Sequence, residues 1–364
     1  MSHCQFGRDL ISYLPEEFME VQTPERQSEL HRRNHYVPCM YLKQWATNGH
    51  ISTYRTLVSD SRVPVWKQSS LQGIAYHEHL YTHVVAGEET DQIERWLDQE
   101  FESPATEAIH NANTGARLSK TDWRHLIRFV ASQDVRTPAR LMENLKRWNE
   151  TVPALVDATL RNSLRNLESA SNAERSRPMA EPCWKDHVPM RVSITKNADN
   201  DEGVVKVETT IGRVMWLFSI KHLLTKTLET LNLNRWMLLT PPDDTTWFTS
   251  DDPVIRLNYY RDGDYDFNGG WANPGTEIML PLGPRCLLYT KVGNRPAHRS
   301  AVVSWQLAYK FRQIIAEHAH RMIFSAAPSI EVPMLRPRIV NADQVLKERS
   351  QWKNWHANQS KAEV

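Results

Sequence analysis

The chain has 364 residues, of which 40% are hydrophobic and 24% charged, the proportions of an ordinary globular protein. Its 44 Lys and Arg residues against 43 Asp and Glu residues give a formal net charge of +1, so no overall field indicates a nucleic-acid or acidic-membrane partner. The length allows one large domain or two, and the composition excludes a disordered chain.

The first half of the chain predicts short strands followed by a helical middle. Residues 1–30 are predicted to be an N-terminal extension. A helix is expected after Pro38, where Val37, Tyr41 and Trp45 recur every four residues. Residues 51–56 and 74–85 read as strands, and the segments 93–101, 119–137 and 139–167 have helical periodicity. The middle of the chain is therefore predicted to be helical.

The second half of the chain predicts mainly strands. Residues 169–189 are polar and contain proline, which indicates a surface loop and an internal break or insertion. A hairpin is expected at 192–207, a helix at 212–231, four β-rich runs between 235 and 292, and a last helix at 302–323. We expect an α+β fold with a helical middle region and an antiparallel sheet formed mainly by the C-terminal half. Residues 31–330 would form a single domain, and 331–364 a C-terminal tail.

The sequence also predicts where the protein is found. The first twenty residues lack the apolar core of a secretory signal, and the most apolar later stretch, 211–224, is interrupted by Arg213, Lys221 and His222. The four cysteines are scattered and form no CxxC pair, which is not the pattern of a disulfide framework or a zinc knuckle. We therefore expect a cytoplasmic protein with no membrane partner. No pattern specifies an oligomeric state.

Three segments occur in a recognisable order. They are RRNHYVPCMYLKQW at 32–45, FVASQDVRTPAR at 129–140, and NRWMLLTPPDDTTWFTSDDPVI at 234–255 followed by MLPLGPRCLLYT. In this order they resemble the uncharacterised family called domain of unknown function 4238. The resemblance covers roughly residues 30–325. It implies membership of this family but no particular reaction, because the family has no established activity. Asp251 is followed here by Asp252 where the family usually has Asn, so Asp251 is the safer functional aspartate.

Four residues of these segments are candidate catalytic residues: His35, Gln133, Arg136 and Asp251. Asp251 lies before a proline-limited turn at a strand end, a position that suits a general base or a metal ligand. His35 is a candidate acid or base, and Arg136, three residues after Gln133 on the same helical face, can bind a phosphate. Each also has a structural interpretation, as a turn cap, a histidine bonded to backbone, or a buried ion pair.

If these residues converge, they predict a hydrolase acting on a phosphodiester or nucleotide substrate. Asp251 and Asp252 would bind a divalent ion, Mg²⁺ or Mn²⁺, that activates water, while Arg136 neutralises charge in the transition state. A metal-dependent nuclease with a bacterial defence or toxin-like role is the form we expect, with nucleic acid or a nucleotide as partner. The chain has no Walker loop, HExxH, G-x-S-x-G or G-x-G-x-x-G motif.

Two alternatives remain open. The protein could be a non-catalytic module that binds a nucleotide or a peptide in a cleft rich in Trp. A glycosidic-bond hydrolase with paired carboxylates ranks lower, because adjacent aspartates rarely face one sugar bond.

A separate metal site is considered at His77 and His79, which share one face if HEHLYTH is extended, although exposed strand histidines are the commoner interpretation. His318 and His320 are two residues apart on the last predicted helix, so they are expected to face different sides.

Overall fold

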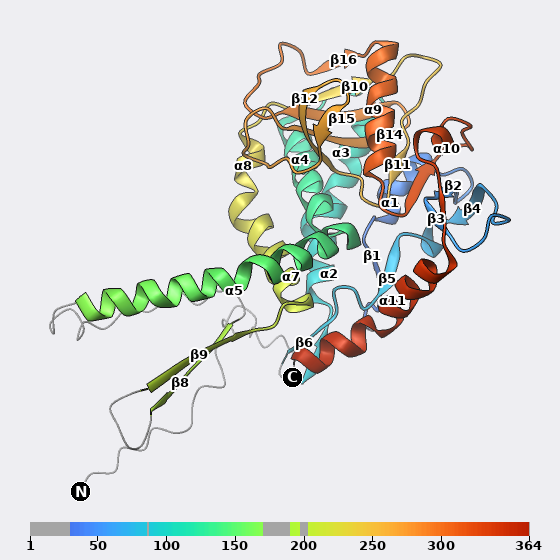
Figure 1. Ribbon diagram of the computed structural model, residues 1–364. Coiled ribbons are helices and arrows are strands. Elements are labelled where there is room, and N and C mark those ends of the chain that lie inside the picture. The colour runs from blue at the N-terminus through green and yellow to red at the C-terminus, as the bar shows by residue number, and fades with distance from the viewer. Residues whose placement is uncertain (1–29, 86, 170–189, 197–202, 364) are drawn as a thin grey trace, which may run out of the picture. The chain divides into compact units, whose positions relative to one another are not determined.

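The computed structural model describes residues 30–85, 87–169, 190–196 and 203–363 (Figure 1). The chain divides into two compact units. Unit 1 comprises Met1–Leu30 and Arg147–Ile211, and unit 2 comprises His31–Lys146 and Gly212–Val364. The predicted N-terminal extension, up to residue 29, and the predicted break, from residue 170 onward, lie outside the described residues. All the candidate residues belong to unit 2.

The structure confirms the α+β fold and a mostly antiparallel sheet from the C-terminal half of the chain. Its strands, in spatial order, are β13 (Asp264–Asp266), β12 (Ile255–Arg261), β14 (Glu277–Gly283), β15 (Cys286–Lys291), β10 (Met237–Thr240) and β16 (Ser300–Val302). Neighbours pair antiparallel except β10 and β16, which are parallel. Six of the seven residues of β14 are buried, as expected for a strand covered on both faces.

The described residues also form helices. They are α1 (Cys39–Leu42), α2 (Gln92–Leu97), α3 (Ser103–Asn113), α4 (Lys120–Val135), α5 (Pro138–Ser169), α7 (Arg213–His222), α8 (Glu229–Asn232), α9 (Trp305–His318), α10 (Val332–Leu335) and α11 (Ala342–Glu363). Phe311, Ile314 and Ile315 of α9 belong to the same buried cluster as residues of β12, β14 and β15. In Figure 1, α9 lies in front of the sheet and α3 and α4 lie behind it. The predicted helical middle is therefore present.

Helix α4 shows how the local sequence sets an element. The Ser119 hydroxyl accepts a hydrogen bond from the Asp122 backbone N–H, and the Asp122 carboxylate accepts one from the Ser119 N–H, so a capping box starts the helix. Pro138 cannot donate the hydrogen bond that would continue α4, but it suits the first turn of α5. The resulting corner holds Arg136 and Thr137.

A second sheet joins segments that are far apart in the sequence. Its order is β11 (Thr249–Ser250), β17 (Met322–Ser325), β2 (His50–Arg55) and β4 (Trp66–Ser70), all antiparallel. Three parts of the chain come together at one end of this sheet, because β17 lies between β11 and β2. They are the end of β2, the turn after β11 and the loop before β17. These three places carry Arg55, Asp251 and His320.

Short pairs of strands complete unit 2. They are β1 (Arg33–His35) with β5 (Tyr76–Glu78), β3 (Leu57–Val58) with β18 (Ile339–Val340), and β6 (His83–Val85) with β7 (Glu88–Thr90). The segment that we predicted to be a C-terminal tail contains α10, β18 and α11, all within unit 2. In unit 1 the predicted hairpin is confirmed as β8 (Met190–Lys196) with β9 (Gly203–Thr209).

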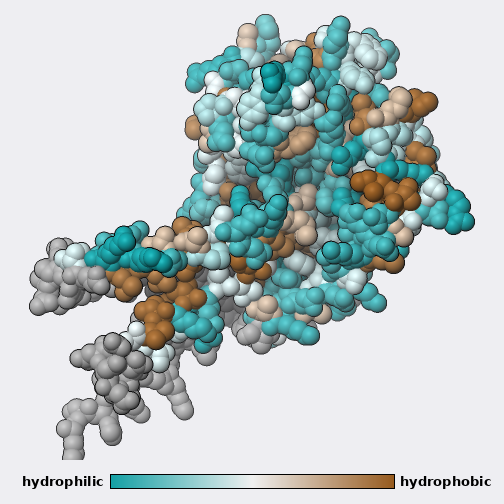
Figure 2. All heavy atoms as spheres, viewed as in Figure 1, coloured by the Kyte–Doolittle hydropathy of each residue, from teal (hydrophilic) through white to brown (hydrophobic). Residues whose placement is uncertain are grey.

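The core accounts for part of the high tryptophan content. Trp45, Trp216, Trp236 and Trp247 are among the largest fully buried side chains. In the view of Figure 2, hydrophilic side chains cover most of the surface of unit 2, and hydrophobic ones appear in scattered groups. Within the described part of the chain, no helix combines the length and apolar character needed to cross a membrane.

Candidate functional site

A pocket of about 350 Å³ lies in unit 2, where the three recognised segments meet. Tyr36 comes from the first segment, Pro138 from the second and Asp251 from the third, and all three line the pocket. His320 and Arg321, from the loop between α9 and β17, line it as well. The three segments therefore meet at this pocket, whereas His35 and Arg136, two of the three side chains that the sequence-based hypothesis brings together, are not part of its lining.

Asp251 ties the turn after β11 to the loop before β17. Its side chain is buried, and Oδ1 accepts hydrogen bonds from the backbone N–H of His320 at 3.0 Å and of Arg321 at 3.1 Å. Oδ2 accepts a second bond from the Arg321 N–H at 2.8 Å. Burial raises the pKa of the Asp251 carboxyl group, against the opposing attraction of the His320 imidazole. Asp251 thus holds the backbone of His320 and Arg321 in place.

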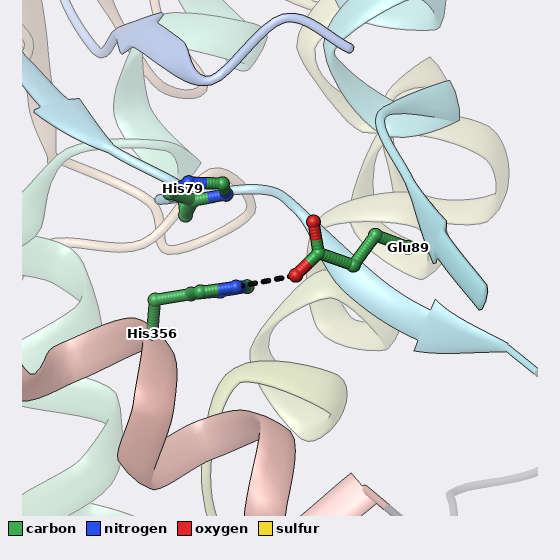
Figure 3. A group of neighbouring side chains, drawn as sticks. All are labelled: His79, Glu89 and His356. Carbon is green, nitrogen blue, oxygen red and sulfur yellow. Dashed lines mark hydrogen bonds and ion pairs between the residues drawn. The ribbon is translucent and has the colours of Figure 1, made fainter. Parts of the chain in front are cut away.

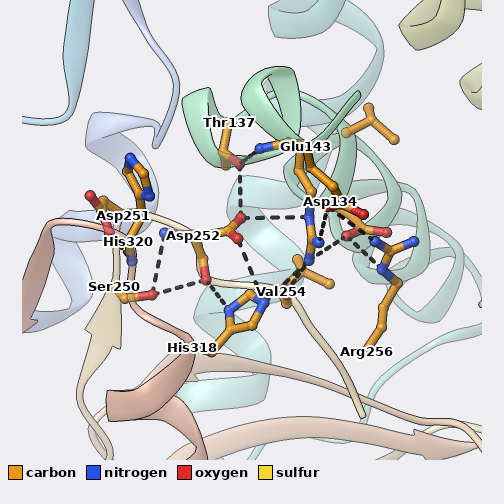
Figure 4. Close-up of polar contacts among 12 residues, drawn as sticks. Asp134, Thr137, Glu143, Ser250, Asp251, Asp252, Val254, Arg256, His318 and His320 are labelled. Carbon is orange, nitrogen blue, oxygen red and sulfur yellow. Dashed lines mark hydrogen bonds and ion pairs between the residues drawn. The ribbon is translucent and has the colours of Figure 1, made fainter. Parts of the chain in front are cut away.

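Asp252 lies on the other side of the same turn (Figure 4). Its Oδ1 accepts a hydrogen bond from the Thr137 hydroxyl at 2.8 Å, and the Arg140 guanidinium and the His318 imidazole lie within 4 Å of its carboxylate. Burial opposes ionisation, but the positive charge of Arg140, helped by His318, outweighs it and lowers the pKa of Asp252. The two neighbouring carboxylates therefore have different partners: backbone N–H groups for Asp251, and the side chains of Thr137, Arg140 and His318 for Asp252.

Arg136 is fully buried in the corner between α4 and α5. Its guanidinium donates hydrogen bonds to the Glu102 carboxylate, the His35 carbonyl oxygen and the Tyr81 hydroxyl. Burial alone would lower the pKa of Arg136, but the Glu102 carboxylate, with help from Glu94, holds it above its usual range. Arg136 does not line the pocket, and its position matches the structural interpretation of a buried ion pair.

His35 and Gln133 are also away from the pocket lining. The His35 Nε2 atom and both side-chain polar atoms of Gln133 are buried without a hydrogen-bond partner in the described part of the structure. Burial lowers the pKa of His35. His35 and Arg136 do meet, but through the His35 carbonyl oxygen rather than its imidazole. Of the four predicted catalytic residues, Asp251 is the one that lines the pocket.

Two histidines of the pocket are free to interact with a ligand. The His77 ring stacks between Tyr36, at 5.4 Å between centroids, and Trp352 of α11, at 3.7 Å. Burial, with a smaller effect of His320, lowers the pKa of His77 to about 4. Neither the His77 nor the His320 imidazole forms a hydrogen bond with a described residue. The sequence analysis considered His77 as a metal ligand with His79 and expected His320 to face a different side from His318, but it did not bring His77 and His320 together.

Three arginines give the pocket its charge. Arg321 forms a two-point ion pair with Glu348 of α11, with Nε–Oε2 at 3.0 Å and Nη2–Oε1 at 2.7 Å. Arg55 of β2 and Arg349 of α11 line the pocket, and neither guanidinium group forms a hydrogen bond or ion pair with any described residue. Because three guanidinium groups face two carboxylates, Asp251 and Glu348, the pocket is suited to an anion.

These contacts place the three segments that suggested a family at one site. The family model described as "Protein of unknown function (DUF4238)" matches residues 33–329. The chain belongs to this family. No curated protein and no solved structure matches the chain. The matched range includes the lining residues Tyr36, Pro138, Asp251 and His320, whereas the lining residues of α11 lie beyond it.

A second group of side chains in this DUF4238 protein, His79, Glu89 and His356, has the composition of a metal site (Figure 3). One ligand atom from each lies within 4.8 Å of the others. The rings of His79 and His356 are stacked with centroids 3.9 Å apart, and His356 Nε2 lies 2.7 Å from Glu89 Oε1. His79 therefore belongs to this group, whereas His77, its predicted partner, belongs to the pocket.

The partner of the other His356 nitrogen argues against a metal at this group. Arg213 Nη1 donates to His356 Nδ1 at 2.9 Å, so the neutral ring carries its proton on Nε2 and donates it to Glu89. A histidine that binds a metal through Nε2 normally carries its ring proton on Nδ1 and donates a hydrogen bond from there. In His356 that proton would point at the Arg213 guanidinium, which is itself a cationic donor. The group instead fastens α11 to the β6–β7 hairpin, next to the Arg213–Glu363 ion pair at 2.7 Å.

Proposed function

We propose that the protein is a hydrolase acting on a phosphodiester or nucleotide substrate, and that the pocket is its active site. The observation that supports this proposal is the combination of three arginines, two unbonded imidazoles and a buried carboxylate in one cavity. Guanidinium groups bind phosphate oxygens through charged hydrogen bonds, and imidazoles transfer protons near neutral pH. We assign the protein to the cytoplasm, and a nuclease with a defence or toxin-like role is one form of this activity.

His320 is the proposed general base. It removes a proton from a water molecule that attacks the phosphorus atom, and the neighbouring Asp251 carboxylate stabilises the imidazolium that forms. The arginines stabilise the negative charge that develops on the phosphate oxygens. The bond from phosphorus to the leaving oxygen breaks, and that oxygen takes a proton from a solvent water molecule. The His320 imidazolium returns its proton to the hydroxide ion left by that water, which restores the neutral imidazole.

In this proposal His320 activates the water molecule, a role that the sequence-based hypothesis assigned to Mg²⁺ or Mn²⁺. The pocket arginines neutralise the charge, a role that it assigned to Arg136. An ion on Asp251 would compete with the backbone N–H groups of His320 and Arg321 for the carboxylate oxygens. Asp252 is engaged by Thr137 and faces Arg140. We therefore expect hydrolysis to persist in EDTA, and activity that disappears in EDTA and returns with Mg²⁺ would restore the metal-dependent hypothesis.

The test is hydrolysis of bis-p-nitrophenyl phosphate, p-nitrophenyl phosphate and nucleotides by the purified protein and its His320→Gln variant. Loss of a general base lowers kcat by roughly 100-fold or more. The matched control is His298→Gln, at an exposed histidine outside the pocket, which we expect to leave kcat unchanged. No turnover of any substrate, or equal turnover by His320→Gln, would contradict the proposal.

The second candidate is a non-catalytic nucleotide-binding module. It is favoured by the Asp251 carboxylate, whose two oxygens already accept backbone hydrogen bonds, as in a purely structural turn. This candidate predicts that nucleotides bind to the pocket without being hydrolysed.

A further inference from the structure

The charges and the size of the pocket indicate which kind of phosphate compound it accepts. We propose that the ligand is a small phosphomonoester, such as a free mononucleotide, whose terminal phosphate binds between Arg55 and Arg349. This inference rests on the proposed function and adds to it the substrate class and the residues that select it.

The first argument is charge. The Arg321 cation is paired with Glu348, and the Asp251 carboxylate interacts with the backbone and with His320. Arg55 and Arg349 remain as two guanidinium groups without an ion pair among the described residues. A phosphomonoester carries between one and two negative charges at neutral pH, whereas an internal phosphodiester of a nucleic acid carries one. Two unpaired cations therefore match the monoester better.

The second argument is size. A cavity of about 350 Å³ is near the lower end of the range for small-molecule sites, roughly 300–1,000 Å³. One of its walls is the helix α11, through Val345, Glu348, Arg349 and Trp352. A nucleic-acid strand needs a groove that continues past each nucleotide, whereas a pocket of this volume suits one nucleotide.

The third argument is that the wall is held in place. Trp352 stacks on His77, Glu348 pairs with Arg321, and His356 bonds Glu89, so α11 is fixed at three positions along its length. Arg349 lies between two of these anchors and is itself exposed. Because α11 lies beyond residues 33–329, this part of the selectivity comes from outside the segment that matches the family.

The experiment measures Kd by isothermal titration calorimetry with inorganic phosphate, adenosine 5′-monophosphate, a dinucleoside monophosphate and an oligonucleotide without terminal phosphates. The proteins are the full chain, Arg349→Gln, Arg55→Gln and the control Lys347→Gln, which removes one charge from α11 outside the pocket. We expect the mononucleotide to bind more tightly than the two diesters. Loss of Arg349 or Arg55 should raise its Kd roughly tenfold or more, because each removes a charged hydrogen bond, while Lys347→Gln should not change it.

The outcomes separate this inference from the proposed function. Tighter binding of the diesters, or equal Kd values for Arg349→Gln and Lys347→Gln, would overturn the phosphomonoester inference even if hydrolysis occurs. Mononucleotide binding that depends on Arg349, without turnover, would support the inference and overturn the hydrolase. Far-UV circular dichroism verifies that the variants are folded. Because Arg55 and Arg349 are exposed, their substitution should leave the fold intact.

Discussion

Burial gives neighbouring residues of the recognised segments different roles. Arg136 and Pro138 are two positions apart, yet Arg136 is enclosed by acceptors in the core while Pro138 lines the pocket. Likewise His35 is turned away while Tyr36 supports the pocket histidine His77. Each recognised segment therefore contributes to the pocket, and the position of each side chain relative to the cavity determines which residues line it.

Arg136 is expected to stabilise the fold rather than to bind substrate. Arg136→Gln should lower the free energy of unfolding by about 3 kcal/mol, because it removes the fully buried cation and leaves the partly buried carboxylate of Glu102 unpaired. Urea denaturation followed by tryptophan fluorescence measures the change. The control is Arg128→Gln, since the more exposed Arg128–Glu100 pair should contribute less than about 1 kcal/mol. If Arg136→Gln is as stable as the unmodified protein but inactive, Arg136 acts in catalysis rather than in stabilising the fold.

Helix α11 acts at the scale of a whole element. None of its residues is buried, and its contacts with the rest of unit 2 are mainly ring stacks, hydrogen bonds and ion pairs. Such an element opens more easily than one that buries an apolar face. The pocket therefore includes a wall whose stability depends on a few side chains.

Trp352 is expected to be the main anchor of α11. Trp352→Ala removes the stack on His77 at 3.7 Å, so the backbone amides of α11 should exchange hydrogen for deuterium faster, while those of α4 should not. Mass spectrometry of peptic peptides measures both helices. The control is Lys353→Ala, at an exposed residue next to Trp352. In this variant the amides of α11 should exchange at the same rate as in the unmodified protein. If the amides of α11 exchange at the same rate in Trp352→Ala as in the unmodified protein, the polar contacts are sufficient to hold the helix in place.

The stability of the whole molecule is expected to depend on pH through His77. Its folded pKa of about 4 lies below the ordinary value of 6.5, so between these values the unfolded chain binds a proton that the folded chain excludes. Above pH 6.5 the protonation of His77 therefore does not reduce the free energy of unfolding. As the pH falls from 6.5 toward 4, the free energy of unfolding decreases. From pH 7 to pH 5 the loss amounts to about 2 kcal/mol.

Urea midpoints at pH 7 and pH 5 test this dependence. His77→Phe keeps a planar ring between Tyr36 and Trp352 but cannot be protonated, so its stability should fall less than that of the unmodified protein over this range. All other titrating groups are common to both proteins and cancel in the comparison. Equal losses in the two proteins would show that His77 has an ordinary pKa.

Several features could be predicted from the sequence because their causes are local. The capping box at Ser119, the helical periodicity of residues 120–135 and the β-rich runs after residue 235 each depend on neighbouring residues, and the structure has these elements. The three ordered segments were sufficient to place the chain in its family. They also located Asp251 at the site.

The composition of the pocket was decided by tertiary structure. Its lining runs from Tyr36 to Trp352, and it assembles because β17 pairs with both β2 and β11 and because α11 packs beside them. Pairings between distant segments depend on which strands and helices pack together, and no local spacing of residues encodes them. For the same reason the sequence determined that Arg136, His77 and Arg349 are present, while packing determined that Arg136 is buried in an ion pair, that His77 is stacked and that Arg349 lines the pocket.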